Sequence, residues 1–308
     1  MDPTTRTAGI DVGGTKVAVA LLDGTELGPT VVEPTAGDDP TALLDQLARM
    51  IAALGPVDAV GVGVPSVVRI ADGRVESSVN LRAFRDVALR HELEARVGVP
   101  VRVDNDGNLA ALSEAWDDRL ALRHRSLVGI TVGTGIGSGI VLDGRPLHGV
   151  RTSAGELGHL TVTADPRGGA PPGGPAPLPT SLERWASGRA LDELARDAGF
   201  ADGPAATDAA LERDDPRAIA VLRTIGERVG VGIAAVVSLL EPEAVVVAGG
   251  VSRAGELLLG PARDAARRLL LPGLGITTDI RVADHGPRAG VRGAALLARL
   301  QEEEKELR

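Results

Sequence analysis

The segment DVGGTK, residues 11–16, carries residue types that can hold a phosphate group. Its glycines lack side chains, so backbone N–H groups can approach an anion closely, and Thr15 and Lys16 can donate to phosphate oxygens. Asp11 can hold Mg²⁺ through water, because Mg²⁺ keeps much of its hydration shell. The segment matches neither a Walker A loop nor a GxGxxG that opens a helix. Taken alone, it is equally typical of an ordinary hairpin with a Gly-Gly turn.

A second glycine-rich segment, TVGTGIG at residues 131–137, again lies between two apolar runs. It matches GxGxxG by letter through Gly133 and Gly135, but a strand follows it rather than a helix, which disfavours a dinucleotide site. Thr131 and Thr134 are hydroxyl donors beside these glycines. We therefore predict a second phosphate turn rather than a plain hairpin, mainly because it repeats the pattern of DVGGTK.

Three polar residues, Asp104, Asn105 and Asp106, end a predicted strand and are followed at once by a predicted helix. A carboxylate there can accept a proton from a substrate hydroxyl, and the neighbouring amide can both donate to the substrate and accept from it. The alternative is a helix N-cap cluster, because Asp and Asn are favoured caps.

The segment SAGELGH places Glu156 and His159 three residues apart among glycines. Acceptors of this kind suit the vicinal hydroxyls of a polyol, although a solvated loop fits as well. Glu183 in SLERW is either a further acceptor or an acid in the first turn of a helix, which the helix dipole favours. We interpret the other histidines as surface residues: His91, His124, His148 and His285.

Apolar periodicity predicts strands and helices in alternation, which favours an α/β fold. The first predicted helix, residues 40–54, has Thr41 as a possible N-cap. Further helices are predicted at 86–99, 107–116, 181–199 and 218–242, with a last one from about 290. Predicted strands occupy both sides of the two glycine-rich turns and the segments 57–68, 100–106, 244–250 and 276–283. A Pro/Gly segment at 164–179 is predicted to be a loop.

Composition excludes several classes of protein. The chain has 308 residues and no cysteine, so disulfides, thiolate zinc sites and cysteine nucleophiles are impossible. The net charge of −9 argues against a broad nucleic-acid interface. No apolar stretch has the length of a membrane span and no secretory signal is visible. We therefore expect a cytoplasmic protein that binds neither nucleic acid nor membrane.

The motifs DVGGTKVAVALLDG, VDAVGVGVP, PVRVDNDGNLAALSE, ITVGTGIGSGIVLDG, SAGELGHLTV, LERWASGRAL and EPEAVVVAGGVS resemble, in order, the landmarks of the ROK family of sugar kinases and repressors. The likeness spans residues 8 to about 298. It implies the actin-like, hexokinase-like ATPase fold, an α/β architecture of two lobes with a duplicated core around a cleft. The lobes are expected at 1–120 and 121–290, with the helix from about 290 packing back on the first.

The resemblance also implies roles for individual residues. Asn105 and Asp106 match the family's substrate asparagine and general base, and AGGVS at 248–252 would be the loop beside the adenosine. The implied sugar contacts are Asn80, Asn105, Asp106, Glu156, His159 and Glu183. The implied nucleotide and phosphate contacts are Asp11, Gly13, Gly14, Thr15, Lys16, Thr131, Gly133, Thr134, Gly135, Gly249 and Gly250, with Asp11 as the Mg²⁺ ligand.

One departure from the family pattern is large. Family members usually carry a CxCGxxGCLE zinc motif after the GH histidine, whereas this chain has a cysteine-free Pro/Gly segment there. A Cys₃His zinc site cannot form. His159 would be oriented by hydrogen bonds alone, and we expect altered substrate preference. Smaller departures are Ser66, where a glycine normally follows the proline, and DGN in place of DAN.

The expected function is ATP-dependent, Mg²⁺-dependent phosphorylation of the primary hydroxyl of a hexose or hexose-like polyol, as in a glucokinase. An aminosugar or C7 cyclitol kinase is an alternative. A non-catalytic sugar-binding or regulatory protein is another, although a repressor would add an N-terminal helix-turn-helix, and only seven residues precede the first strand. Which sugar, which phosphoryl donor and whether the chain forms a homodimer or homotetramer stay open.

Overall fold

The computed structural model describes residues 4–37, 39–78, 81–162, 180–274 and 277–300. Its contacts divide the chain into two compact units. Unit 1 consists of residues 1–125, 139–154 and 287–308, and unit 2 of residues 126–138 and 155–286. The expected first lobe was 1–120 with the helix from about 290, and the contacts also group residues 121–125 and 139–154 with it.

Unit 1 is built on a mixed sheet in the order β3-β2-β1-β5-β8, with β4 paired to the same edge of β2. The strands β1 and β2 form the antiparallel hairpin expected around DVGGTK, whereas β1, β5 and β8 run parallel. Their bounds are β1 (Arg6–Val12), β2 (Lys16–Asp23), β3 (Glu26–Leu27), β4 (Val31–Pro34), β5 (Ala59–Val64) and β8 (Val101–Asn105). Parallel pairing places the carboxyl ends of β1, β5 and β8 at one edge.

Two helices, α1 (Pro40–Ala52) and α2 (Leu89–Val97), complete the first core of unit 1. The N-cap of α1 is Asp39 and not Thr41: the carboxylate of Asp39 accepts from Thr41 N at 3.1 Å. The reason is that Pro40 suits the first helical position, which puts the cap one residue earlier.

The predicted strand 57–68 is two strands in the structure. It breaks at Pro65 into β5 and β6 (Ser66–Arg69), because proline has no N–H to donate to a ladder. The strand β6 pairs with β7 (Arg74–Ser78), and the short helix η1 (Arg82–Phe84) follows.

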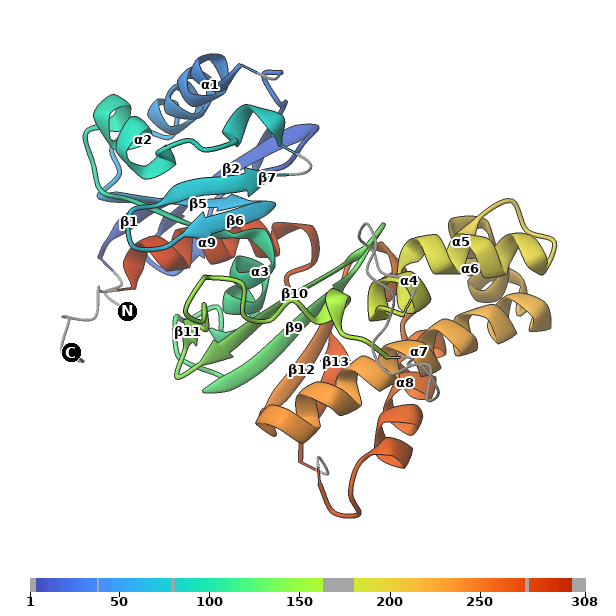
Figure 1. Ribbon diagram of the computed structural model, residues 1–308. Coiled ribbons are helices and arrows are strands. Elements are labelled where there is room, and N and C mark those ends of the chain that lie inside the picture. The colour runs from blue at the N-terminus through green and yellow to red at the C-terminus, as the bar shows by residue number, and fades with distance from the viewer. Residues whose placement is uncertain (1–3, 38, 79–80, 163–179, 275–276, 301–308) are drawn as a thin grey trace. The chain divides into compact units, whose positions relative to one another are not determined.

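The helices α3 (Asp106–Ala115) and α9 (Ala289–Arg299) cross one another against the unit 1 sheet (Figure 1). Glycines permit the close approach: a Cβ on Gly61 or on Gly293 would overlap backbone atoms of Ala294 or of Leu109. Arg292 of α9 is 3% exposed and donates to carbonyl groups at the end of α3. The last predicted helix therefore packs within unit 1.

The second sheet has the order β11-β10-β9-β12-β13. Strand β12 runs parallel to both β9 and β13. The bounds are β9 (Ser126–Val132), β10 (Ile136–Leu142), β11 (Arg145–Pro146), β12 (Ala244–Ala248) and β13 (Asp279–Val282). The strand expected at 276–283 is thus shorter, and residues 139–146 carry β10 and β11 into unit 1.

The helices of unit 2 differ from prediction in one place. The helix expected at 181–199 is two helices, α4 and α5, that meet at Ser187 and Gly188, and α6 is an additional helix. Gly226 and Gly230 let α7 pack closely on α8, because side chains there would overlap carbonyl oxygens of α8. The bounds are η2 (Leu157–His159), α4 (Leu182–Ala186), α5 (Gly188–Asp197), α6 (Gly203–Arg213), α7 (Pro216–Leu240), η3 (Gly250–Ala254), α8 (Glu256–Leu269) and η4 (Gly286–Arg288).

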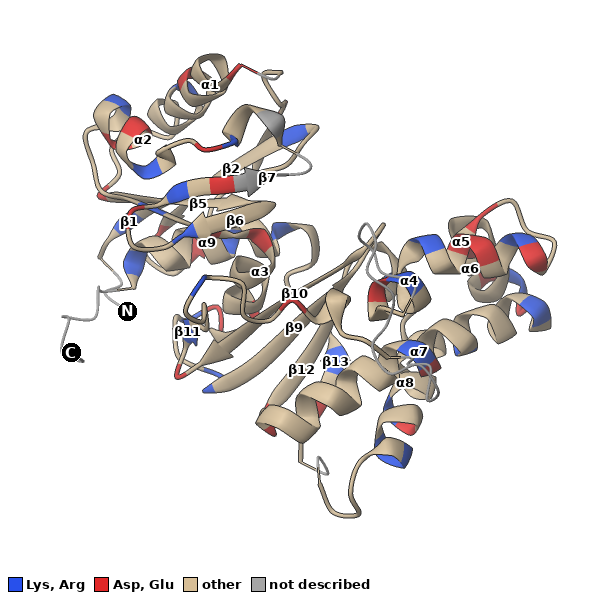
Figure 2. Cartoon of the chain, in the orientation of Figure 1, with Lys and Arg blue, Asp and Glu red and all other residues tan. Residues whose placement is uncertain are grey.

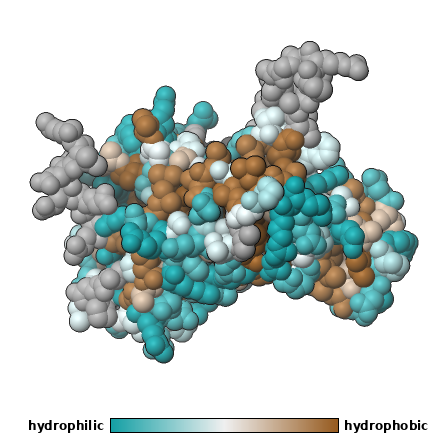
Figure 3. All heavy atoms as spheres, turned by 90° about the horizontal axis from the view of Figure 1, so that it is seen from below, coloured by the Kyte–Doolittle hydropathy of each residue, from teal (hydrophilic) through white to brown (hydrophobic). Residues whose placement is uncertain are grey.

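Charged residues mark the helices of each unit, and the central strands are almost free of them (Figure 2). The surface shows apolar as well as polar side chains (Figure 3), with Val150, Leu239 and Leu271 among the exposed large hydrophobic residues. Among helices of the described residues, none combines the length and apolar character needed to cross a bilayer.

Candidate active site

The DVGGTK turn is a compact hairpin loop with an exposed tip, and hydrogen bonds to Thr35 hold it in place. Val12 pairs with Val17 across the hairpin, and Gly13 N donates to Lys16 O at 2.9 Å. Thr35 donates through its hydroxyl to Gly13 O at 2.8 Å and through its N–H to Thr15 O at 3.1 Å. The tip at 14–16 is exposed. The loop therefore presents backbone, hydroxyl and ammonium groups to solvent on a fixed support.

Asp11 lies directly before this turn, near the carboxyl end of β1. Burial raises the pKa of its carboxyl group, and the positive charge of Lys16 opposes that rise. A Cβ placed on Gly290, in the first turn of α9, would lie 2.6 Å from an Asp11 carboxylate oxygen. The helix backbone thus packs against this carboxylate, and only glycine fits there without displacing it.

Asn105 and Asp106 stand where β8 ends and α3 begins. Asn105 is the N-cap of α3: its side-chain oxygen accepts from Gly107 N at 2.8 Å, and its amide donates to Ser66 O at 3.3 Å. Asp106 is the first helical residue, and its carboxylate also accepts from Gly107 N at 2.8 Å. The capping interpretation is therefore correct for Asn105, and it leaves the Asp106 carboxylate at the positive end of the helix dipole.

The strand register brings the first glycine-rich turn and the start of α3 to one edge. Asp11 is paired with Gly63 of β5, and Gly63 is paired with Asp104 of β8. The three residues form one row across the sheet, so DVGGTK and Asn105 lie at the same sheet edge, at the ends of β1 and β8 with β5 between them. Unit 1 thus holds the DVGGTK turn and the Asp106 carboxylate at the same edge of its sheet.

The contact between His148 and Asp104 could not be foreseen from the sequence. The interpretation of His148 as a surface residue is wrong: its Nε2 atom lies 2.6 Å from Oδ2 of Asp104, and its side chain is 24% exposed. The other oxygen, Oδ1, accepts from Asn105 N at 2.7 Å and from Asn108 Nδ2 at 2.9 Å. Only the structure could show this, because 44 residues separate the two side chains.

In unit 2 the second glycine-rich turn joins β9 to β10. Gly133 N donates to Gly135 O at 2.9 Å, and Gly133 O accepts from Gly188 N at the start of α5 at 2.7 Å. Gly249, with φ of +90°, follows β12 and presses against the backbone of Val132. The structure thus brings residues 131–135, the start of α5 and residues 249–250 together.

Glu183 in α4 is tied to this second turn. One of its oxygens, Oε2, accepts from Ile136 N at 2.9 Å, and a Cβ on Gly135 would overlap the carboxylate. Glycine is therefore needed at position 135 to make room for the acid.

Glu156 directly precedes the short helix η2 and His159 is its last residue, and both are exposed. Ser138 of β10 holds this segment, since its hydroxyl donates to Gly155 O and accepts from Leu157 N at 3.0 Å. The segment is joined to the start of α4, because Leu182 N donates to Leu160 O at 2.8 Å. Glu156, His159 and Glu183 therefore project from connected segments of unit 2. Asn80 lies outside the described residues.

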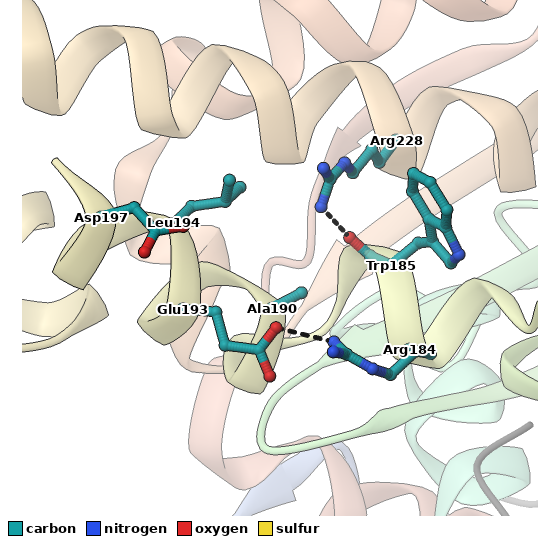
Figure 4. A pocket seen from close by; sticks show the side chains of 7 residues that line it. All are labelled: Arg184, Trp185, Ala190, Glu193, Leu194, Asp197 and Arg228. Atoms are coloured by element: carbon teal, nitrogen blue, oxygen red, sulfur yellow. Dashed lines mark hydrogen bonds and ion pairs between the residues drawn. The ribbon is translucent and has the colours of Figure 1, made fainter. Parts of the chain in front are cut away.

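Two cavities lie beside α4 and α5. One, of about 200 Å³, is lined by Glu183, Arg184, Ser187, Arg189 and Glu193. The other, of about 350 Å³, adds Trp185, Ala190, Leu194, Asp197 and Arg228 to Arg184 and Glu193 (Figure 4). Arg228 donates to Trp185 O at 2.9 Å and lies over its ring, 5.0 Å from the centroid.

The larger cavity is lined by two arginines and two acidic residues. Burial lowers the pKa of Arg228, and the positive charge of Arg184 lowers it further. Arg184 is itself paired with Glu193 at 2.8 Å. Of the predicted site residues, Glu183 alone lines one of the two cavities, although the motif LERWASGRAL supplies several of the other lining residues.

The family model for the ROK family matches residues 7–301. The chain belongs to the ROK family. It is 34% identical to a glucokinase of Halalkalibacterium halodurans, with 97% of this chain and 96% of the relative covered. It is 32% identical to an N-acetyl-D-glucosamine kinase of Escherichia coli O157:H7, with 94% and 98% covered.

Among solved structures, the chain resembles a ROK family glucokinase from Streptomyces griseus, described in complex with glucose and AMPPNP. The identity is 32%, the TM-score is 0.77, and the match covers 96% of this chain and 99% of that one. The α/β fold with an actin-like, hexokinase-like architecture is therefore confirmed for this ROK protein.

This ROK protein cannot form a Cys₃His zinc site. The chain has no cysteine, and the described residues contain no group of three or more His, Asp or Glu side chains able to hold a metal ion.

Proposed function

We propose that this ROK protein is an ATP-dependent sugar kinase that phosphorylates the primary hydroxyl of a hexose or hexose-like polyol. The observation that carries the proposal is the row Asp11, Gly63 and Asp104, which places the DVGGTK turn and the Asn105-Asp106 pair at one sheet edge. A kinase needs an anion-binding turn and a hydroxyl-directed carboxylate near one another. The kinase relatives support the same reaction class.

Asp106 is the proposed general base. Its carboxylate would accept the proton of the attacking hydroxyl while that oxygen forms a bond to the γ-phosphorus and the bond from phosphorus to the β,γ-bridging oxygen breaks. The products are the sugar phosphate and ADP, with one proton released. Asn105 would hold the same hydroxyl, using the amide that now contacts Ser66 O.

The two glycine-rich turns would bind the nucleotide. In unit 1 the exposed tip at 14–16 offers N–H, hydroxyl and ammonium donors. In unit 2 residues 131–135 and 249–250 would contact the phosphates and the adenosine side. Asp11 fits a water-mediated Mg²⁺ ligand, because a bound cation would offset the burial that raises the pKa of its carboxyl group. The chemistry that Mg²⁺ supplies in such a site is neutralisation of phosphate charge.

Glu156, His159 and Glu183 would bind the ring hydroxyls of the sugar. They project from connected segments of unit 2 that Ser138 and the bond between Leu182 N and Leu160 O hold in place. His159 would be oriented without a zinc ion. Acceptors of this kind specify a polyol and leave the choice among sugars to the rest of the pocket.

An N-acetylated or free aminosugar is the second candidate substrate, and the N-acetyl-D-glucosamine kinase relative favours it. Substrate selection is expected to differ from zinc-containing members. We further propose a homodimer or homotetramer, which light scattering after gel filtration would measure.

The test is turnover of Mg²⁺-ATP by the purified protein with glucose, mannose, glucosamine, N-acetylglucosamine and a C7 cyclitol. ADP release and NMR of the product would be measured together, so that the phosphorylated position is identified. Phosphorylation of a primary hydroxyl in one of these supports the proposal. Ligand binding without turnover, using ATP and also polyphosphate as donors, would favour a non-catalytic sugar-binding protein instead.

A further inference from the structure

We propose that His148 is a positioning residue for phosphoryl transfer, acting on Asn105 and Asp106 through the buried carboxylate of Asp104. The inference rests on the proposed sugar kinase activity. His148 lies in the loop after β11, within unit 1.

The carboxylate of Asp104 connects three segments. It is buried, with its side chain 2% exposed. Its Oδ1 atom accepts from the N–H of Asn105 and from the side-chain amide of Asn108 in the first turn of α3. Its Oδ2 atom is in contact with His148 Nε2 at 2.6 Å. One side of the carboxylate therefore holds the start of α3, and the other side is held by His148.

This geometry makes His148 the support for the orientation of Asp104. A buried carboxylate is costly unless its oxygens are hydrogen-bonded, so loss of the imidazole would leave Oδ2 without this partner. The carboxylate would then reorient to find another donor or water. Since Oδ1 holds Asn105 N and Asn108 Nδ2, that reorientation would loosen the turn in which Asp106 is the first residue.

His148 is itself fixed by its loop. Its backbone oxygen accepts from Ala154 N at 3.0 Å, and the preceding Leu147 N donates to Ile140 O of β10 at 2.8 Å. The neighbouring Gly139 on the same strand packs against Gly107 and Asn108. The start of α3 is thus held on one side by the β10 backbone and on another by the imidazole of His148.

The consequence is a specific kinetic signature. Positioning of a general base governs the chemical step, and small displacements of a catalytic group lower the rate strongly. His148→Ala should therefore lower kcat at least 10-fold. The KM for ATP should stay within about 2-fold, because the contacts of His148 and Asp104 support the start of α3 and not the DVGGTK turn. A purely structural role would lower the amount of folded protein without changing kcat per folded molecule.

The experiment compares wild type, His148→Ala, His148→Gln and His91→Ala in the full chain. Gln places a side-chain amide near the position of Nε2, so His148→Gln should recover most of the lost kcat. Added imidazole should partly restore His148→Ala, since the side chain is near the surface. His91 is exposed on α2 of the same unit, so His91→Ala is the matched control and should behave as wild type. Thermal unfolding would measure the folded fraction of each variant.

Two outcomes separate this inference from the proposed function. If wild type phosphorylates no sugar with any donor, the kinase proposal fails. If wild type is active and His148→Ala keeps its kcat, or if the loss is neither reduced by Gln nor by imidazole and follows the folded fraction, the kinase proposal stands and His148 has no positioning role.

Discussion

Gly139 of β10 lies so close to Gly107 of α3 that a methyl group at position 139 would be 2.5 Å from the Gly107 carbonyl oxygen. The same methyl group would be 2.7 Å from Cα of Asn108. Both contacts are with backbone, which cannot move aside as a flexible side chain would. The first turn of α3, with Asp106 in it, is therefore placed partly by the absence of a side chain on a neighbouring strand.

Gly139→Ala should displace the start of α3. Overpacking of this kind costs about 1–3 kcal/mol of unfolding free energy, and the displacement of Asp106 should lower kcat by more than the loss of folded protein explains. Chemical denaturation and steady-state kinetics would measure the two effects. Gly260→Ala in α8 is the control, because a Cβ there meets no atom within 4 Å. Wild-type kinetics in Gly139→Ala would show that this close approach has no role in the site.

Asp11→Asn should separate stability from activity. Burial raises the pKa of Asp11 in the folded protein, so the charged form is disfavoured by folding, and stability falls as the pH rises from the unfolded pKa to the folded one. Above the folded pKa the cost is complete, and asparagine would remove it. The ligand-free variant should therefore be as stable as wild type or more stable at pH 7.

The same substitution should abolish most sugar phosphorylation if Asp11 serves the Mg²⁺-ATP site. Thermal unfolding at pH 7 and pH 5, with kinetics over a range of Mg²⁺ concentrations, would measure both effects. A variant that is clearly less stable at pH 7 and fully active would contradict the role given to this carboxylate.

Gly135→Ala should weaken sugar binding through Glu183. The added methyl group would overlap the Glu183 carboxylate, which would lose its bond from Ile136 N. Because the overlapping atoms are the end of a flexible side chain, we expect little change in melting temperature but a KM for the sugar raised about 10-fold or more. An unchanged KM would mean that the Glu183 carboxylate does not contact the sugar.

Arg292→Met should destabilise unit 1. This arginine of α9 is 3% exposed and donates to Ser113 O at 2.5 Å, Trp116 O at 3.1 Å and Asp117 O at 2.6 Å. Methionine fills much of the volume but leaves these carbonyl oxygens without the guanidinium, at a cost of roughly 3 kcal/mol. Chemical denaturation would measure the loss, and a change below about 1 kcal/mol would show that water replaces the guanidinium.

Sequence periodicity predicted most of the strands and helices, because apolar side chains recur every second residue or every third and fourth residue wherever one face is buried. It failed where the backbone chemistry of single residues decides where a strand or helix begins or ends. Pro65 divides one predicted strand, and Asp39 caps α1 directly before Pro40. One expected helix is interrupted at Ser187, which lies between α4 and α5.

In the candidate site, too, some residues could be predicted from motifs, whereas others depend on contacts that only the structure shows. Motifs drew attention to Asp11, Asn105 and Asp106, because each lies at or beside the end of a buried strand. They gave no sign of His148, whose partner Asp104 lies in a different part of the sequence. Nor could they show that a side chain at positions 135, 139 or 290 would collide with neighbouring atoms, because this depends on what packs against each glycine.

The most direct test of the account is Asp106→Asn, studied with the sugar on which wild type is most active. General-base catalysis contributes about 10²–10⁴-fold, so kcat should fall by at least 100-fold. Calorimetry should show sugar and nucleotide binding within a few-fold of wild type, since asparagine keeps the shape and the helix N-terminus. A variant that binds both ligands and retains near-normal kcat would contradict the central claim that Asp106 takes the proton from the attacking hydroxyl.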